Sequence, residues 1–219
     1  MEANSAEGDP VAQDSSVQFT VTRSLSKEQA ARRVRLVEAA RALAEEGGYP
    51  AVTMHDVADR ADVARATVYR YFASKDHLLT EVATSWARSV IAESTFALLP
   101  NEGVMALDGT PIERLTILLE TIVEMAAANL TLTSAIIQAL TSSDPSIEPP
   151  RAELFLFIRS RLSDAVGDVL QAQEDVEIVL GHLLLSALVS LTSLRRPTDE
   201  VLGMVRTAAR LIMSGALPS

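Results

Sequence analysis

Apolar residues recur every three or four positions along most of the chain, which is the spacing that lines one face of an α-helix. Leu36, Ala40 and Leu43 form one such stripe near the beginning. No stretch of useful length alternates apolar with polar residues, as a half-buried strand would. The pattern therefore predicts an all-α fold. Helices are expected over about 26–46, 75–98, 110–128, 131–142, 150–172, 176–194 and from 198 onward, with two short helices within 53–75.

Residues that favour helix ends support these boundaries. Ser26 with Gln29, and Thr110 with Glu113, have the spacing of a capping box, in which each side chain bonds a backbone N–H that the helix leaves unpaired. The Gly47–Gly48 pair is typical of a helix C-terminus. The boundaries of the helices expected over about 26–46 and 110–128 are therefore supported by capping residues as well as by periodicity.

The segment 53–75 is predicted to form two short helices joined by a tight turn. Thr53 and Asp56 suit the start of the first helix, where an oxygen acceptor and an acid are both favourable. The turn is expected at residues 61–63, because Asp62 is one of the few residues other than glycine that tolerates a left-handed backbone.

The second short helix presents two different faces. Val68 and Phe72 lie four positions apart and are predicted to point inward together. The residues left on the outside, none of them acidic, are Arg65, Ala66, Thr67, Tyr69 and Arg70. A helix of about two turns with such a face suits insertion into the major groove of DNA.

The sequence Thr-Val-Tyr-Arg-Tyr-Phe-Ala-Ser-Lys-Asp-His-Leu-Leu at 67–79 resembles the signature of the tetracycline-repressor (TetR) family of bacterial transcription regulators. Together with the segments at 47–54 and 57–64, the resemblance covers about 27–85. Within the family, this part is most similar to actinobacterial repressors of steroid and lipid catabolism genes. One departure is Ala64, which stands where members often carry a serine cap.

The resemblance implies a helix-turn-helix DNA-binding domain over 25–75 and a larger helical domain for ligand binding and dimerisation over 76–219. It also implies a set of DNA contacts at Thr53, His55, Arg65, Ala66, Thr67, Tyr69, Tyr71 and Lys75. Arg65 is the candidate for bidentate recognition of guanine, and Ala66 suits contact with a thymine methyl group. Phosphate contacts are expected from Thr53, Tyr69, Tyr71 and Lys75.

The distribution of charge agrees with contact between DNA and this segment alone. The whole chain has a net charge of −10. Residues 23–88 carry 11 Lys and Arg against 9 Asp and Glu, whereas residues 89–219 carry 8 against 16. Residues 1–22 carry four acids and no base, so 1–24 is expected to be a disordered acidic tail. Only the segment with the motif is net positive, as phosphate binding requires.

Other residue types exclude several classes of function. The chain has no cysteine, and its histidines, His55, His77 and His182, are scattered without metal-ligand spacing. Enzyme motifs such as a P-loop are absent, so we expect no catalytic site, cofactor or metal. There is no recognisable signal peptide, and the longest apolar tract, Leu183–Leu194, is too short to span a bilayer. A cytoplasmic protein with no membrane contact is therefore expected.

The stretch Val176–Leu194 is apolar on nearly all sides, which indicates burial on all sides and hence a partner subunit. The resemblance likewise implies that the last two helices pair with their copies in a homodimer. The expected interface residues are Leu184, Leu188, Leu191, Val201, Val205, Ala208 and Ile212.

The resemblance further implies a cavity for a small hydrophobic or amphipathic effector. Its expected lining is Trp86, Phe96, Met125, Asn129, Thr133, Ile137, Gln138, Phe155 and Ile158. The predicted function is a ligand-responsive repressor that binds double-stranded DNA at a palindromic operator. The alternatives are a constitutive repressor without an effector, and an all-α module whose helix-turn-helix binds protein.

Overall fold

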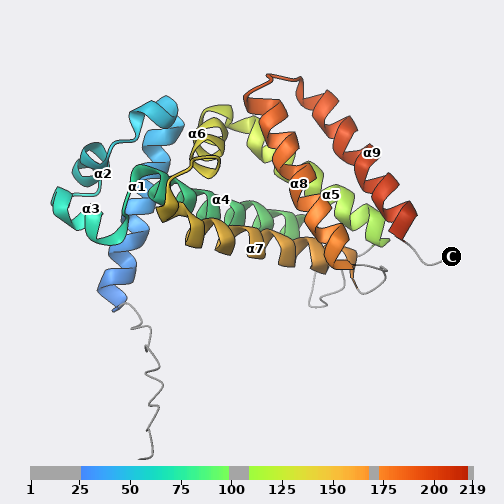
Figure 1. Ribbon diagram of the computed structural model, residues 1–219, viewed down its shortest axis with the longest axis horizontal. Coiled ribbons are helices and arrows are strands. Elements are labelled where there is room, and N and C mark those ends of the chain that lie inside the picture. The colour runs from blue at the N-terminus through green and yellow to red at the C-terminus, as the bar shows by residue number, and fades with distance from the viewer. Residues whose placement is uncertain (1–25, 99–108, 168–172, 217–219) are drawn as a thin grey trace, which may run out of the picture.

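The computed structural model describes residues 26–98, 109–167 and 173–216, and within these ranges all regular structure is helical (Figure 1). The expected tail over 1–24 lies outside the described residues. The helices are α1 Lys27–Ala51, α2 Met54–Arg60, α3 Arg65–Tyr71, α4 Lys75–Leu98, α5 Pro111–Ala128, α6 Leu130–Leu140, the short 3-10 helix η1 Pro145–Ile147, α7 Glu148–Val166, α8 Gln173–Thr192 and α9 Thr198–Ala216. The expected all-α fold is confirmed.

Helices α1, α2 and α3 form a small body at one end of the molecule (Figure 1). Its core contains Leu36 and Ala40 from α1, Val57 from α2, and Val68 with Phe72 from the region of α3, all fully buried. Their mutual burial fixes the angle between the two short helices, because close-packed side chains leave little room for a shift.

The end of α1 is shaped by glycine. Gly48 has φ of 68°, a left-handed conformation that side chains other than glycine rarely adopt, and it kinks the chain before the last turn of α1. Beyond the kink the chain turns into α2. The Arg60 guanidinium donates to both carboxylate oxygens of Glu46, at 2.8 and 2.7 Å, and so ties α2 back to α1. The predicted stop at Gly47–Gly48 thus corresponds to a real change of direction.

Helix α4 connects the small body to the larger helical body formed by α5–α9 (Figure 1). It packs against α1 of the small body and against α5, α6 and α7 of the larger one. Helix α5 packs against α9, α7 and α8, so it is the central element of the larger body. Thr110 and Glu113 form the predicted capping box at its start. Since α1 also packs against α6, the two bodies share an extended contact.

Helix α8 is more apolar than the rest of the structure. By length and composition alone, Glu174–Thr192 could cross a bilayer. The expectation of a tract too short to do so was made for Leu183–Leu194, which overlaps only the second half of this helix. In the fold, 39% of that stretch is buried by the neighbouring helices. A core helix of a globular protein meets the same criterion, and α8 indeed packs against α5, α6, α7 and α9.

Candidate nucleic-acid interface and internal cavity

The first helix of the motif begins as its sequence predicts. The Thr53 hydroxyl oxygen accepts a hydrogen bond from the Asp56 backbone N–H at 3.1 Å and donates to the Asp56 carboxylate at 2.6 Å. These bonds satisfy one of the unpaired N–H groups at the start of α2 and fix the direction in which the chain enters it. His55, on the outer side of the same turn, lies 3.6 Å from Asp59 and is exposed.

The turn between α2 and α3 depends on Asp62, whose φ is 51°. The next residue, Val63, donates its N–H to the carbonyl oxygen of Ala58 at 3.0 Å, which closes the turn. Ala64 occupies the N-cap position of α3 and makes no side-chain bond there. The turn therefore has the predicted geometry, and α3 lacks the cap that a serine would provide.

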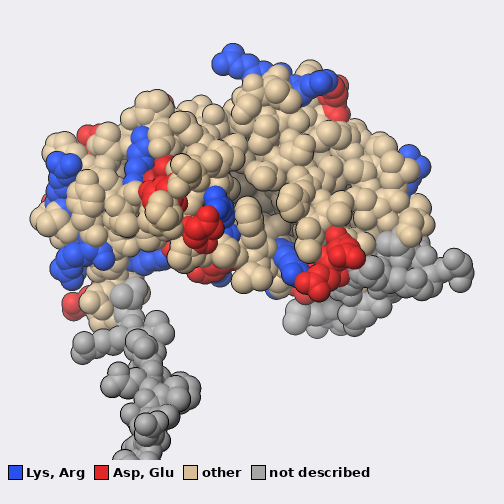
Figure 2. All heavy atoms as spheres, in the orientation of Figure 1, with Lys and Arg blue, Asp and Glu red and all other residues tan. Residues whose placement is uncertain are grey.

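Helix α3 exposes the residues that its pattern places outside. Val68 and Phe72 are fully buried, whereas Arg65, Ala66, Tyr69 and Arg70 are exposed and Thr67 is half-buried. The Arg65 guanidinium lies 5.7 Å from the centre of the Tyr69 ring, which holds it along the outer face of α3. Figure 2 shows Lys and Arg gathered at the end of the molecule that α1–α3 form. The exposed face thus combines hydrogen-bond donors with positive charge.

Two of the expected phosphate contacts have other positions in the structure. The Tyr71 hydroxyl is buried and has no hydrogen-bond partner, so it does not point out from α3. The Lys75 ammonium donates to the carbonyl oxygen of Tyr49 at 2.7 Å and lies 3.6 Å from the Tyr49 ring centre. Burial lowers the pKa of Lys75. Sequence alone placed both residues on the outside, because helical spacing cannot predict contacts with residues that are distant in the chain.

A cavity of about 440 Å³ lies among α4, α5, α6, α7 and α8. On the face shown in Figure 2 the surface is hollowed between α6 and α8. Four of the expected lining residues, Trp86, Ile137, Phe155 and Ile158, do line it. The rest of the lining is mainly aliphatic, including Val90, Ile122 and Leu184. The cavity is within the size range, roughly 300–1,000 Å³, of pockets for small organic ligands.

Four other residues expected in the lining are elsewhere. The Asn129 side chain accepts from the Leu132 N–H at 3.0 Å and caps α6. Thr133 is buried but donates to the Ala126 carbonyl oxygen at 2.9 Å, Gln138 is exposed, and Met125 packs against the core. The side chain of Phe96 lies outside the described residues. The polar groups expected to orient a ligand are therefore used for helix capping or face solvent.

The polar residues that do line the cavity are Arg159, Glu177 and His182, which sequence reasoning missed. Arg159 Nε donates to Glu177 Oε2 at 2.7 Å, across the contact between α7 and α8. The sequence did offer one signal for this site, which is the position of Glu177 near the start of a helix that is otherwise mostly apolar. Periodicity alone could not indicate which helix would supply its partner.

Comparison with known proteins settles the family. Residues 36–82 match the family described as bacterial regulatory proteins, tetR family. The HTH-type transcriptional repressor KstR of Mycolicibacterium smegmatis is 31% identical to this chain over 190 residues, which are 86% of this chain and 90% of that repressor. The chain belongs to the TetR family. It is a DNA-binding transcriptional regulator and not an enzyme.

Solved structures agree with this assignment. A TetR transcriptional regulator from Rhodococcus sp. RHA1 superposes with a TM-score of 0.72 at 26% identity, covering 86% of this chain and 98% of that one. The regulator FadR from Bacillus subtilis, solved in complex with stearoyl-CoA, gives a TM-score of 0.57 at 16% identity, covering 83% and 98%. The second likeness concerns the fold alone.

In this TetR-family regulator a polar cluster joins the small body to the larger one. The Tyr49 hydroxyl donates to Asp76 Oδ1 and the Ser142 hydroxyl donates to Asp76 Oδ2, each at 2.6 Å. Burial and the bond to Asp76 raise the pKa of Tyr49 to about 12, so this hydroxyl stays a donor. The Asp76 carboxylate at the start of α4 therefore links the last turn of α1 to the segment that follows α6.

The residues expected at the dimer interface mostly face the regulator's own core. Within the single chain, Leu184, Leu188, Leu191, Val201 and Val205 are buried, and only Ala208 and Ile212 are partly exposed. The first five therefore have packing partners within the protomer, and their place in an interface stays a prediction. An apolar helix surrounded by neighbours buries one face in its own domain, and the pattern could not indicate which face that is. The apolar residues that α8, α9 and their connection leave exposed are Ile178, Val179, Leu194, Met204 and Leu211.

Proposed function

We propose that this protein is a cytoplasmic, ligand-responsive repressor that binds an inverted-repeat operator as a homodimer. Residues 25–75 would bind DNA, and residues 76–219 would bind the effector and form the dimer. The observation that carries the proposal is the outer face of α3, where Arg65, Ala66 and Tyr69 are exposed while Val68 anchors the helix from behind. Such a helix can enter the major groove without disturbing its own core.

The proposed DNA contacts are made by residues whose side chains the fold leaves exposed to solvent. We propose that Arg65 binds guanine, that Ala66 and Thr67 contact neighbouring bases, and that Thr53, His55 and Tyr69 hold the backbone. Lys75 acts from within, because its ammonium group supports the last turn of α1 at the Tyr49 carbonyl oxygen. A twofold dimer places two such helices roughly 34 Å apart or somewhat more, which calls for an inverted repeat.

The dimer is proposed to form through the outer faces of α8 and α9. Val179 on α8, and Met204 and Leu211 on α9, are large apolar side chains exposed in the single chain. Figure 2 shows few charged atoms over the middle of these two helices. Exposed apolar side chains that gather on neighbouring helices are typical of a protein–protein interface, and pairing them with their copies by a twofold axis covers both sets at once.

The effector is proposed to be a small hydrophobic or amphipathic molecule that binds in the 440 Å³ cavity. Trp86 on α4 and Ile137 on α6 both line the cavity. Helix α4 begins at the motif and α6 packs against α1, so a ligand that shifts either helix also moves the small body. FadR, which has the same fold, was solved in complex with stearoyl-CoA, an acyl thioester.

The release mechanism would be a population shift between two arrangements of the domains. The ligand would favour the state in which the two recognition helices no longer match successive major grooves. A tenfold loss of operator affinity requires the ligand's binding free energy to differ between the two states by only about 1.4 kcal/mol. A constitutive repressor would instead keep the same operator affinity with every apolar compound tested.

Substitution of Arg65 tests the proposed reading of DNA. Arg65→Ala is expected to weaken operator binding by ~1–3 kcal/mol and to relax base preference at one position in each half-site. Footprinting and competition binding at a fixed salt concentration would measure both effects. As a control, Arg41→Ala removes an arginine that is paired with Glu45 within α1 and should leave the base preference unchanged. Binding of a monomer to a single asymmetric half-site, or affinity without steep salt dependence, would contradict the proposal.

A further inference from the structure

The connection between α3 and α4 is held by a histidine that is not among the proposed DNA contacts. We infer that His77, as the neutral imidazole, is a positioning residue for α3, and that its protonation weakens operator binding. The inference rests on the proposed reading of DNA by α3 and adds to it a residue that acts through the helix.

Helix α3 depends on its surroundings for its position. It has only seven residues, and Ala64 at its N-cap makes no side-chain bond. A helix of that length is marginal on its own in water. At its other end Phe72 is fully buried, and the Phe72 N–H donates to the Val68 carbonyl oxygen at 3.0 Å. The contacts that fix the chain directly after Phe72 therefore help to set the direction of α3.

His77 makes those contacts from the first turn of α4. Its Nδ1 accepts a hydrogen bond from the Ala73 N–H at 3.3 Å, and its own N–H donates to the Ser74 hydroxyl oxygen at 3.1 Å. The imidazole also packs edge-on against the Phe72 ring, with 5.6 Å between the ring centres. His77 thus contacts each of the three residues that join α3 to α4.

The bond from Ala73 requires a neutral imidazole. A backbone N–H can only donate, so Nδ1 of His77 carries no proton and the ring proton is on Nε2. A second proton on Nδ1 would turn this acceptor into a donor that faces another donor. Protonation therefore removes the bond that holds Ala73 and loosens the connection to α3.

The surroundings of the ring favour its neutral form. The charged groups that face His77 are Glu81 on α4, Arg33 on α1 and Asp144 before η1. Burial lowers the pKa of His77 below its ordinary value of 6.5, Glu81 and Asp144 oppose this shift, and Arg33 adds to it. The stabilisation that the neutral ring contributes is present above pH 6.5 and is lost as the pH falls through the lower pKa of the folded protein.

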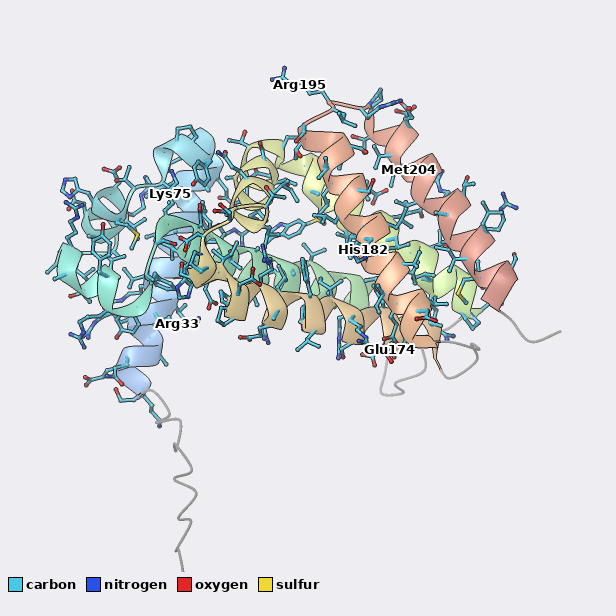
Figure 3. All side chains as sticks on the ribbon, viewed as in Figure 1. Arg33, Lys75, Glu174, His182, Arg195 and Met204 are labelled. Carbon is cyan, nitrogen blue, oxygen red and sulfur yellow. The ribbon has the colours of Figure 1, made fainter. Side chains whose placement is uncertain are left out.

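Arg33 adds a second hold on the same connection. Its guanidinium lies 5.7 Å from the centre of the Phe72 ring and pairs with Glu81. In Figure 3, Arg33 lies on α1 where the chain passes from α3 to α4. Phe72 therefore has a cation from α1 and the imidazole of His77 beside it, and a charged imidazole would place two cations around one ring.

Two substitutions at position 77 separate the acceptor from the ring. Asparagine places Oδ1 where histidine has Nδ1, so His77→Asn keeps an acceptor that does not titrate, whereas His77→Phe keeps a ring and removes the acceptor. The probe is the DNA duplex that the wild-type protein selects from a random pool at pH 7.5. We expect His77→Asn to bind it within about twofold of the wild type and His77→Phe to bind about fivefold more weakly. Wild-type affinity in His77→Phe would overturn the inference.

The pH profile tests the effect of protonation. Between pH 7.5 and 5.0 at constant ionic strength, the affinity of the wild type should fall at least about threefold relative to that of His77→Asn. His55 and His182 are present in both proteins, so their titration cancels in this ratio. Circular dichroism at each pH verifies that both proteins stay folded, so the ratio reports on DNA binding and not on unfolding. A ratio that does not change with pH would contradict the inference.

Nitrogen NMR of the wild type gives a measurement that needs no variant. At pH 7.5 the imidazole of His77 should carry its proton on Nε2, and a proton on Nδ1 would overturn the inference. The proposed function is tested separately. If Arg65→Ala weakens operator binding while both variants at position 77 behave as the wild type at every pH, only the role of His77 fails. If no substitution at position 65 or 77 alters binding, the proposed reading of DNA by α3 fails as well.

Discussion

Leu211→Glu is expected to produce a folded protomer that neither dimerises nor binds its operator. Leu211 is 59% exposed on α9 within the single chain, so a glutamate there can remain in water and the protomer keeps its core. In the proposed interface the same carboxylate would be buried without a partner, at a cost of several kcal/mol. Sedimentation equilibrium at micromolar concentration would measure the loss of the dimer. Operator affinity should fall by at least about 100-fold, which corresponds to roughly 2.7 kcal/mol.

Two further variants separate the interface from the core. Leu130→Glu places the same charge on another exposed leucine, at the start of α6, and should leave the protein dimeric. Val205→Glu places it at a fully buried position of α9 and should unfold the larger body, which circular dichroism would detect. A dimeric Leu211→Glu protein with normal operator affinity would show that the outer face of α9 is not the interface.

Asp76→Ala is expected to lower the free energy of unfolding by about 3 kcal/mol, because it removes two hydrogen bonds to a charged group. The hydroxyl groups of Tyr49 and Ser142 both lose their acceptor, and α4 loses an acid from its first turn. Thermal and chemical unfolding would measure the loss. Because Asp76 links the small body to the segment after α6, effector-induced release of operator DNA should also weaken.

The pKa of Tyr49 is an independent measure of the hydrogen bonds that Asp76 accepts from Tyr49 and Ser142. Its pKa is raised to about 12 in the folded protein, above the ordinary value of 10.0. The stabilisation that accompanies this shift is present below pH 10 and is lost as the pH rises through about 12. In Asp76→Ala the pKa of Tyr49 should fall toward its ordinary value, which ultraviolet absorbance would follow.

A matched control is available at the start of α9. Asp199 is also an acid in the first turn of a long helix, and no hydrogen bond links it to another element among the described contacts. Asp199→Ala should therefore cost only the interaction with the helix dipole, ~0.3–1 kcal/mol. Equal destabilisation by the two substitutions would mean that Asp76 acts locally and does not join the two bodies.

Local chemistry determined much of the DNA-reading end from sequence alone. The cap at Thr53, the left-handed turn at Asp62 and the inward pair of Val68 and Phe72 all have their predicted geometry. Each depends on residues within four or five positions of one another, so neighbouring sequence contains the whole cause. The capping box at Thr110 was predictable for the same reason.

Contacts between distant residues were decided only by the tertiary structure. Tyr49 and Ser142 meet Asp76 across 27 and 66 positions, and Arg159 meets Glu177 across 18. Periodicity identifies an apolar stripe but not the helix that covers it, which is why Leu188 and Val205 were taken for interface residues and lie in the protomer core. The sequence thus determined where helices begin, turn and end, whereas packing determined which of their faces stay exposed, because burial is a property of the assembled helices.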